Sequence, residues 1–485
     1  MSQGKTTARA LTLHYLARIG AVDKRGPRIN SIIELNPDAV SIATELDKRR
    51  AAKRPCGPLH GIPILLKDNI CTRDRMSTSA GSPVLIGVTP PRDAFLAARL
   101  REAGAVILGK ANLSEWANIR STRSTSGWSS RGGLTRNPYA LDRNTSGSSS
   151  GSAAAVAANL AVAAIGTETD GSIVSPASIN GIVGIKPTVG LVSRNGIIPI
   201  AASQDTAGPM ARTVADAVAI LSVMAGVDTR DAATQSSMGK RVSDLTQFLI
   251  ADGLRGARIG VARNFFGGSD LVKEVIEQAL NVLRDRGAVL VDPVELPNSD
   301  KYSKTELEVL LYELKAGLNA YLAEFADGAE VRSLKELIAY NERHRAKVMP
   351  YFGQEHFLAA DAKGPLDSPD YLAALETSRR YSRQEGIDQV LTEHKLDALV
   401  APTGGPAWLT DFINGDAETG SFSSPAAVAG YPHITVPAGF VHGLPIGLSL
   451  VGTAYSEPTL IRLAYGFEQA TKHRRPPQFL KSAPV

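Results

Sequence analysis

A lysine at the end of an apolar run is the first residue of this 485-residue chain that could do chemistry. Residues 62–66 follow a Pro/Gly turn and are predicted to form a buried strand, which ends directly in Lys67. Burial disfavours the charged ammonium and lowers the pKa of a lysine, so Lys67 could act as a neutral general base near pH 7. A lysine at a strand end can instead extend its ammonium into solvent, and the strand alone leaves both interpretations open.

The second segment is residues 146–152, which contain only serine and glycine. Small residues let the backbone approach its neighbours closely, and serine hydroxyls can relay a proton. A flexible linker, or a simple cap for the next helix, would have the same composition. Residues 147–151 also match the G-x-S-x-G nucleophile elbow around Ser149, but the polar residues 137–146 make a poor preceding strand. The elbow would also need a downstream histidine, which could be His356, His394, His433 or His442.

The third segment, residues 166–173, is predicted to be a loop between a strand and a helix, with Ser172 just before the helix. Backbone N–H groups at the start of a helix favour negative charge, which is what an oxyanion hole requires. A phosphate-binding loop would use the same geometry, but the Walker pattern with its lysine is absent. Glu168 and Asp170 would also repel a phosphate, and they could instead orient hydroxyl or amine groups.

The elements that must position these segments alternate between helix and strand patterns, which predicts an α/β domain with a covered sheet. Helices are expected at 6–19, 37–50, 94–103, 153–158, 271–286 and 457–472. Strands are expected at 62–66, 105–109, 160–165, 257–262, 288–291, 396–400, 434–437 and 446–451. Residues 300–395 are charged and mostly helical in pattern, so we expect a helical insertion or cap within a single domain spanning residues 1–485.

Composition limits the classes of function. The net charge of +5 and the pI of about 9.0 come from scattered Lys and Arg residues, which argues against nucleic-acid binding. No apolar stretch reaches the ~20 residues of a membrane span, and the polar N-terminus lacks the core of a signal peptide. Cys56 and Cys71 form no disulfide framework, so we expect free thiols and a cytoplasmic protein, unless a signal peptide has been removed. The histidines form no HExxH or Cys/His pattern, and neither a metal nor a cofactor is expected.

Taken together, the three segments resemble the hallmarks of the amidase signature family. Those hallmarks are a strand ending in Lys-Asp, a segment with paired serines and a downstream Gly-Ser loop, and they read here as Leu66-Lys67-Asp68-Asn69, Gly147-Ser148-Ser149 and Thr169-Asp170-Gly171-Ser172. The resemblance covers nearly the whole chain and is strongest to bacterial peptide amidases, through residues 112–118, 127–133, 166–174 and 204–210. It implies a large mixed, twisted β-sheet covered by helices on both faces, with a mostly helical insertion.

The resemblance also implies the roles of individual residues. Ser172 would be the nucleophile, Ser148 a bridging serine with a cis peptide bond, and Lys67 the base. The oxyanion hole would consist of the backbone N–H groups of Thr169, Asp170, Gly171 and Ser172.

Three positions depart from the pattern of many family members. Asp170 replaces a glycine, and Val174 replaces an arginine, and both changes occur in the peptide-amidase branch. Loss of the arginine argues against a carboxylate clamp at that position, because arginine is the usual bidentate partner of a carboxylate. Ser150 also replaces a glycine, which suits the same turn only if its backbone torsions are ordinary.

We therefore expect an amidohydrolase that cleaves carboxamide C–N bonds through an acyl-enzyme, and the branch implies removal of C-terminal amides from peptides. Three alternatives are an amidase for aryl or acyl amides, a protein similar to the glutamine amidotransferase subunit that works in a complex with a nucleic-acid partner, and a non-catalytic binding module. The expected partner is a small-molecule or peptide amide, not nucleic acid or a membrane. Selection among substrates is expected to depend on residues 300–360 and 401–430.

Overall fold

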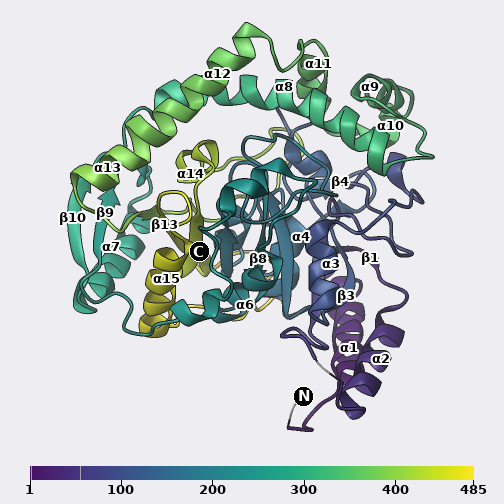
Figure 1. The fold of residues 1–485 in the computed structure, drawn as a ribbon, viewed down its shortest axis with the longest axis horizontal. Helices are drawn as coiled ribbons and strands as arrows, with labels where there is room; N and C mark the ends of the chain where they lie inside the picture. The colour runs from purple at the N-terminus through teal and green to yellow at the C-terminus, as the bar shows by residue number, and fades with distance from the viewer. Residues whose placement is uncertain (2, 55, 485) are drawn as a thin grey trace.

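A mixed sheet of 11 strands forms the centre of the computed structural model, which describes residues 1, 3–54 and 56–484 (Figure 1). Its strand order is β1-β3-β2-β6-β8-β7-β12-β13-β11-β9-β10. Neighbours pair in parallel among β3, β2 and β6 and among β11, β9 and β10, and all other neighbours pair antiparallel. The strands of this sheet are β1 (Ile32–Leu35), β2 (Pro63–Lys67), β3 (Val106–Ala111), β6 (Ala163–Glu168), β7 (Val183–Lys186), β8 (Thr206–Ala211), β9 (Arg258–Ala262), β10 (Val289–Val294), β11 (Ala398–Pro402), β12 (His433–Val441) and β13 (Leu444–Val451). A separate pair consists of β4 (Trp128–Ser129) and β5 (Gly133–Leu134).

Helices surround this sheet and also form a long segment between β10 and β11. They are α1 (Ala8–Arg18), α2 (Ala39–Ala51), α3 (Phe95–Glu102), α4 (Ser150–Ala157), α5 (Val174–Ile179), α6 (Val214–Met224), α7 (Asp270–Asp285), α8 (Ser299–Phe325), α9 (Leu334–Arg343), α10 (Arg345–Val348), α11 (Glu355–Asp361), α12 (Pro369–Arg379), α13 (Asp388–Glu393), α14 (Ser424–Ala429) and α15 (Glu457–Thr471). None of the helices in the described residues combines the length and the apolar character needed to cross a membrane.

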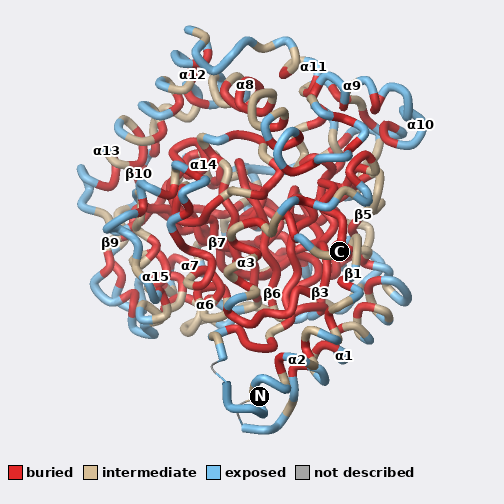
Figure 2. The backbone as a smooth tube through the Cα atoms, turned by 45° about the vertical axis from the view of Figure 1, so that its right-hand side comes forward, coloured by how far each residue is buried: buried red, intermediate tan, exposed pale blue. Residues whose placement is uncertain are grey.

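Two hydrophobic clusters lie on opposite faces of the sheet, because successive side chains of a strand point to opposite sides. Along β2, Leu65 belongs to one cluster, and Ile64 and Leu66 belong to the other. The Leu65 cluster contains apolar residues of α1, α2, α4 and α5, and the second contains those of α3, α6, α7 and α15. The buried backbone accordingly concentrates in the sheet and the adjoining layers (Figure 2). The expected α/β class, with a large mixed sheet covered on both faces, is confirmed.

The helices between residues 299 and 393 lie together along one side of the molecule (Figure 1). The longest is α8, with 27 residues, and it packs against α12 through Val309 and Tyr312 on one side and Tyr371 and Ala374 on the other. Of the two cysteines, Cys56 is exposed and Cys71 is buried, and both are free thiols.

The structure corrects two expected boundaries next to the candidate site. The expected loop at 166–173 is shorter, because β6 continues through Glu168, where it pairs with Thr206 of β8. Pairing with a neighbouring strand overrides the weak strand tendency of a Gly-Thr-Glu sequence. The expected helix at 153–158 begins earlier, at Ser150, so this serine has helical torsions and its hydroxyl donates to the carbonyl of Ser146 over 2.6 Å. Local sequence patterns did not predict β1, β7, β8 or α6.

A glycine inside the sheet gives a direct test of this packing. A Cβ atom at Gly208 of β8 would lie 1.9 Å from the carbonyl oxygen of Ile185, whereas one at Gly268 would meet nothing within 4 Å. We expect Gly208→Ala to lower the free energy of unfolding by about 2 kcal/mol or more, because the backbone of β7 must move. Urea unfolding measures this loss, with Gly268→Ala as the matched control. Equal unfolding midpoints for the two variants would contradict the strand arrangement.

Candidate active site

Lys67 ends β2 with its side chain fully inside the protein, so it does not extend into solvent. Its amine nitrogen lies 2.8 Å from Ser148 Oγ, 2.9 Å from Thr167 Oγ1 and 3.1 Å from the carbonyl oxygen of Thr167. Asn69 also donates to Thr167 Oγ1, over 3.0 Å. β2 and β6 are parallel neighbours in the sheet, which is why residues 100 positions apart in the chain meet here.

These three contacts can be made by a neutral amine as well as by an ammonium. A neutral amine has two N–H donors and one lone pair, whereas an ammonium has three donors. The carbonyl and hydroxyl oxygens of Thr167 can accept the two N–H groups, and the hydroxyl of Ser148 can donate to the lone pair. Burial lowers the pKa of Lys67 to about 7, although the negative charges of Glu168 and Asp205 oppose this shift.

Ser148 lies in the turn that precedes α4, and the peptide bond between Gly147 and Ser148 is cis. Its carbonyl oxygen accepts from the backbone N–H of Ser114 over 3.1 Å. The next backbone N–H, that of Ser149, donates to the carbonyl oxygen of Ser172 over 3.2 Å, so this turn contacts the Gly-Ser loop directly.

The nucleophile-elbow interpretation of Ser149 is wrong. The segment before it, residues 137–146, is not a strand, and the Ser149 side chain is fully buried. Its hydroxyl donates to the carbonyl oxygen of Thr167 over 3.1 Å and accepts from the N–H of the same residue over 3.2 Å. His433, one of the expected partners, is buried and bonded to Ser449. Ser149 therefore fixes the strand next to Lys67.

The carboxylate of Glu168 holds the loop that contains Ser172. Glu168 Oε2 accepts from the N–H groups of Ile173 over 2.7 Å and of Val174 over 3.0 Å, which anchors the start of α5 to the end of β6. Gly171 has a φ of 76°, a left-handed conformation that suits glycine. A Cβ atom at this glycine would also approach Ser423 Oγ to 3.1 Å.

Residues 204 and 205 hold the other end of this loop. Asp205 accepts from Thr169 Oγ1 over 2.6 Å and from the N–H groups of Ile200 and Ala201 over 2.8 and 2.9 Å. Burial raises the pKa of Asp205 to about 6. Gln204 donates to the carbonyl oxygen of Thr169 over 3.3 Å and to Glu306 of α8 over 2.9 Å. One amide side chain therefore joins the loop to α8.

A cavity of about 330 Å³ adjoins the loop and is lined by all four residues from Thr169 to Ser172. Within the described residues, Ser172 Oγ makes no hydrogen bond, and no acceptor contacts the N–H groups of Asp170, Gly171 or Ser172. An oxyanion hole needs N–H donors of this kind, which lie beside a cavity and have no acceptor within the protein. The structure joins Lys67 to Ser148 by a hydrogen bond. It brings Ser172 next to this pair through the backbone hydrogen bond between Ser149 and Ser172.

Segments that are distant in the sequence complete the cavity. Leu310 comes from α8, and residues 408–424 supply Trp408, Asp416 and Glu418 together with three serines. Among the described residues, no histidine, lysine or arginine is part of the lining. No cluster of three or more His, Cys, Asp or Glu residues in the described ranges is arranged to hold a metal ion.

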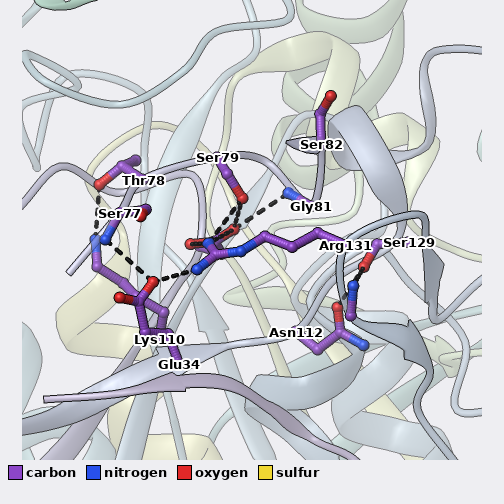
Figure 3. Close-up of polar contacts among 12 residues, drawn as sticks. Glu34, Ser77, Thr78, Ser79, Gly81, Ser82, Lys110, Asn112, Ser129 and Arg131 are labelled. Atoms are coloured by element: carbon purple, nitrogen blue, oxygen red, sulfur yellow. Dashed lines mark hydrogen bonds and ion pairs between the residues drawn. The ribbon is translucent and has the colours of Figure 1, made fainter. Parts of the chain in front are cut away.

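A polar cluster near the end of β2 gives a structural role to several segments that contain no proposed catalytic residue (Figure 3). Arg131 forms an ion pair with Glu34 of β1 and donates to Ser79 Oγ over 3.0 Å. It also lies 3.5 Å from the carboxylate of Asp68, the residue after Lys67. Asn112 accepts from Ser129 Oγ over 2.7 Å and, through its backbone carbonyl, from the N–H of Gly151 over 2.9 Å. The cluster ties the Ser/Gly-rich segments to the strands beside Lys67.

Thr167, Asp205 and Gln204 are site residues that the sequence patterns did not predict. Thr167 contacts Lys67 through pairing between strands, a relation that local periodicity does not contain. Asp205 and Gln204 did lie in a run noted for its resemblance, residues 204–210, and two polar residues directly before a strand were the available signal.

Known proteins resemble this chain in sequence and in overall structure. The Amidase family model matches residues 10–461. The structure of native peptide amidase from Stenotrophomonas maltophilia is 55% identical, with a TM-score of 0.94, and the match covers 99% of this chain and 96% of that chain. A probable amidase from Arabidopsis thaliana is 42% identical, over 99% of this chain and 90% of that protein. A glutamyl-tRNA(Gln) amidotransferase subunit of Chloroflexus aurantiacus is 38% identical, over 99% of this chain and 97% of that protein.

A family match over nearly the whole chain, together with these similarities, shows the class of enzyme. This protein belongs to the amidase signature family and is an amide hydrolase that resembles peptide amidases.

Proposed function

We propose that the protein hydrolyses the C-terminal amide of peptides through a triad of Ser172, Ser148 and Lys67. The observation that supports the triad is the 2.8 Å contact between the buried amine of Lys67 and Ser148 Oγ, directly behind a cavity lined by Ser172. The similarity to peptide amidases supports the substrate class, since that identity of 55% exceeds the 38% to the glutamyl-tRNA(Gln) amidotransferase.

The proposed reaction begins with neutral Lys67, whose lone pair takes the proton of Ser148 while Ser148 takes that of Ser172. Ser172 Oγ attacks the amide carbon, and the N–H groups of residues 169–172 stabilise the oxyanion, a contribution of about 3 kcal/mol per donor. The proton returns through Ser148 to the amide nitrogen, the C–N bond breaks, and ammonia leaves. Water then hydrolyses the acyl-enzyme by the same relay and releases the free acid.

We further propose that residues 300–395 act as a cap within one domain. Leu310 of α8 lines the cavity, and Glu306 of the same helix accepts the hydrogen bond from Gln204. These contacts connect the helical segment to the cavity wall. They support its role as a cap that restricts the acyl part of the substrate.

Replacing the triad tests the mechanism. We expect Ser172→Ala to abolish turnover, and Ser148→Ala and Lys67→Ala each to reduce kcat by about 10³-fold or more, since the three residues act as a unit. Mass spectrometry on a panel of amidated peptides, anilides and glutamine measures the loss of turnover and also identifies the substrate class. Ser41→Ala, on the exposed side of α2, is the matched control and should keep full activity. Loss of activity in a folded Ser149→Ala variant, with Ser172→Ala still active, would overturn the assignment.

The pH profile tests Lys67 as the base. Above pH 7 the amine is neutral and competent, and below pH 7 it is protonated, so kcat/KM should fall about tenfold per pH unit on the acid side. Asp205 carries a negative charge that raises the pKa of Lys67, so Asp205→Asn should move the midpoint to lower pH. A rate that stays constant down to pH 5, or a midpoint that moves upward in the variant, would argue against lysine as the base.

A further inference from the structure

The cavity beside Ser172 has an unusual balance of charge. Three carboxylates line it, those of Asp170, Asp416 and Glu418, and its described lining contains no cationic side chain. None of the three forms an ion pair with a lysine, arginine or histidine in the described part of the chain. A fourth carboxylate, Glu306 of α8, interacts with Asp170, and burial and this neighbour raise the pKa of Glu306 well above its usual range.

In the described residues, only neutral groups donate hydrogen bonds to Asp416 and Glu418. Asp416 accepts from the N–H and hydroxyl of Ser126 over 3.1 and 2.5 Å and from Trp408 Nε1 over 3.2 Å. Glu418 accepts from Ser175 Oγ over 3.0 Å. Burial in the cavity, and then the charges of Asp170 and Asp416, raise the pKa of Glu418 to about 7. A carboxylate whose pKa is raised in this way gains stability when a positive charge binds next to it.

The carboxylate of Asp170 likewise has no cationic partner in the described residues. Its Oδ2 accepts from Ser424 Oγ over 2.6 Å. The side chain also shares a hydrogen bond with the carboxyl group of Glu306, so the partners of Asp170 carry no positive charge.

An independent feature marks this cavity as a ligand site. Ser172 is only 8% exposed, yet its hydroxyl has no hydrogen-bond partner in the described residues and lines the cavity. Trp408, which donates to Asp416, lines the same cavity. The acidic groups therefore line the same cavity as Ser172, where an amide would bind.

We propose that this cavity selects amides whose acyl part carries a positive charge, such as a guanidinium or ammonium group, over neutral and acidic ones. The inference rests on the proposed function, because it assigns the substrate class of the same site. The physical basis is that a cleft walled by one sign of charge concentrates the opposite sign and strengthens its hydrogen bonds. A substrate carboxylate would be repelled by the acidic side chains of this lining, which offers it no cationic side chain.

A matched pair of substrates tests this selectivity. Nα-acetyl-L-argininamide and Nα-acetyl-L-citrullinamide have nearly the same shape, but only the first is charged. At pH 8 we expect kcat/KM to be about tenfold higher for the arginine compound, and the ratio to fall as ionic strength rises. In Glu418→Gln the ratio should fall to about threefold or less. Glu45→Gln, on the exposed side of α2, makes the same change in net charge and should leave the ratio unchanged.

Binding to the Ser172→Ala variant separates this inference from the proposed function. Calorimetry should give an about tenfold lower Kd for the arginine compound than for the citrulline compound, independently of turnover. If the wild type hydrolyses neither compound but this binding preference persists, the inference holds and the proposed peptide amidase activity fails. Equal Kd values, or a preference that survives Glu418→Gln undiminished, would overturn the inference.

Discussion

The amine of Lys67 is buried at the end of a central strand, and the rest of the site depends on keeping it there without a counter-ion. Its contacts are a carbonyl and two hydroxyls rather than a carboxylate, so burial lowers its pKa to about 7 with no ion pair to reverse the effect. The sheet supplies this environment by placing β2 between β3 and β6, and the two hydrophobic clusters exclude water from both faces.

Two other buried lysines show that burial alone does not define such a site. Lys110 of β3 donates to Thr78 Oγ1 over 2.8 Å and to the carbonyl of Ile70, so it ties a loop to the sheet. Lys186 of β7 has nearby negative charge from Glu168 and Glu457, and burial lowers its pKa to about 8. Of these three, Lys67 is the one whose amine contacts a serine hydroxyl next to a cavity.

Local sequence signals predicted most of the elements that carry the site, because they are strongly periodic or strongly biased in composition. The strand before Lys67 and the small-residue segment at 146–152 belong to this group. The contacts of Thr167 with Lys67, and of Asp205 with Thr169, were not predictable, because they arise from strand pairing and from chain crossings that no local pattern encodes. The same holds for Asp416 and Glu418, which reach the cavity from a loop about 250 residues after Ser172 in the chain.

The side chain of Gln204 bonds to Thr169 in the Gly-Ser loop and to Glu306 in the long helix α8. In the proposed reaction the N–H groups of this loop stabilise the oxyanion, and a shift of α8 would move the carbonyl of Thr169 in the same loop. On that basis we expect changes in α8 that are meant to alter substrate selection to alter the rate of cleavage as well. A library that varies α8 should therefore vary residue 204 at the same time.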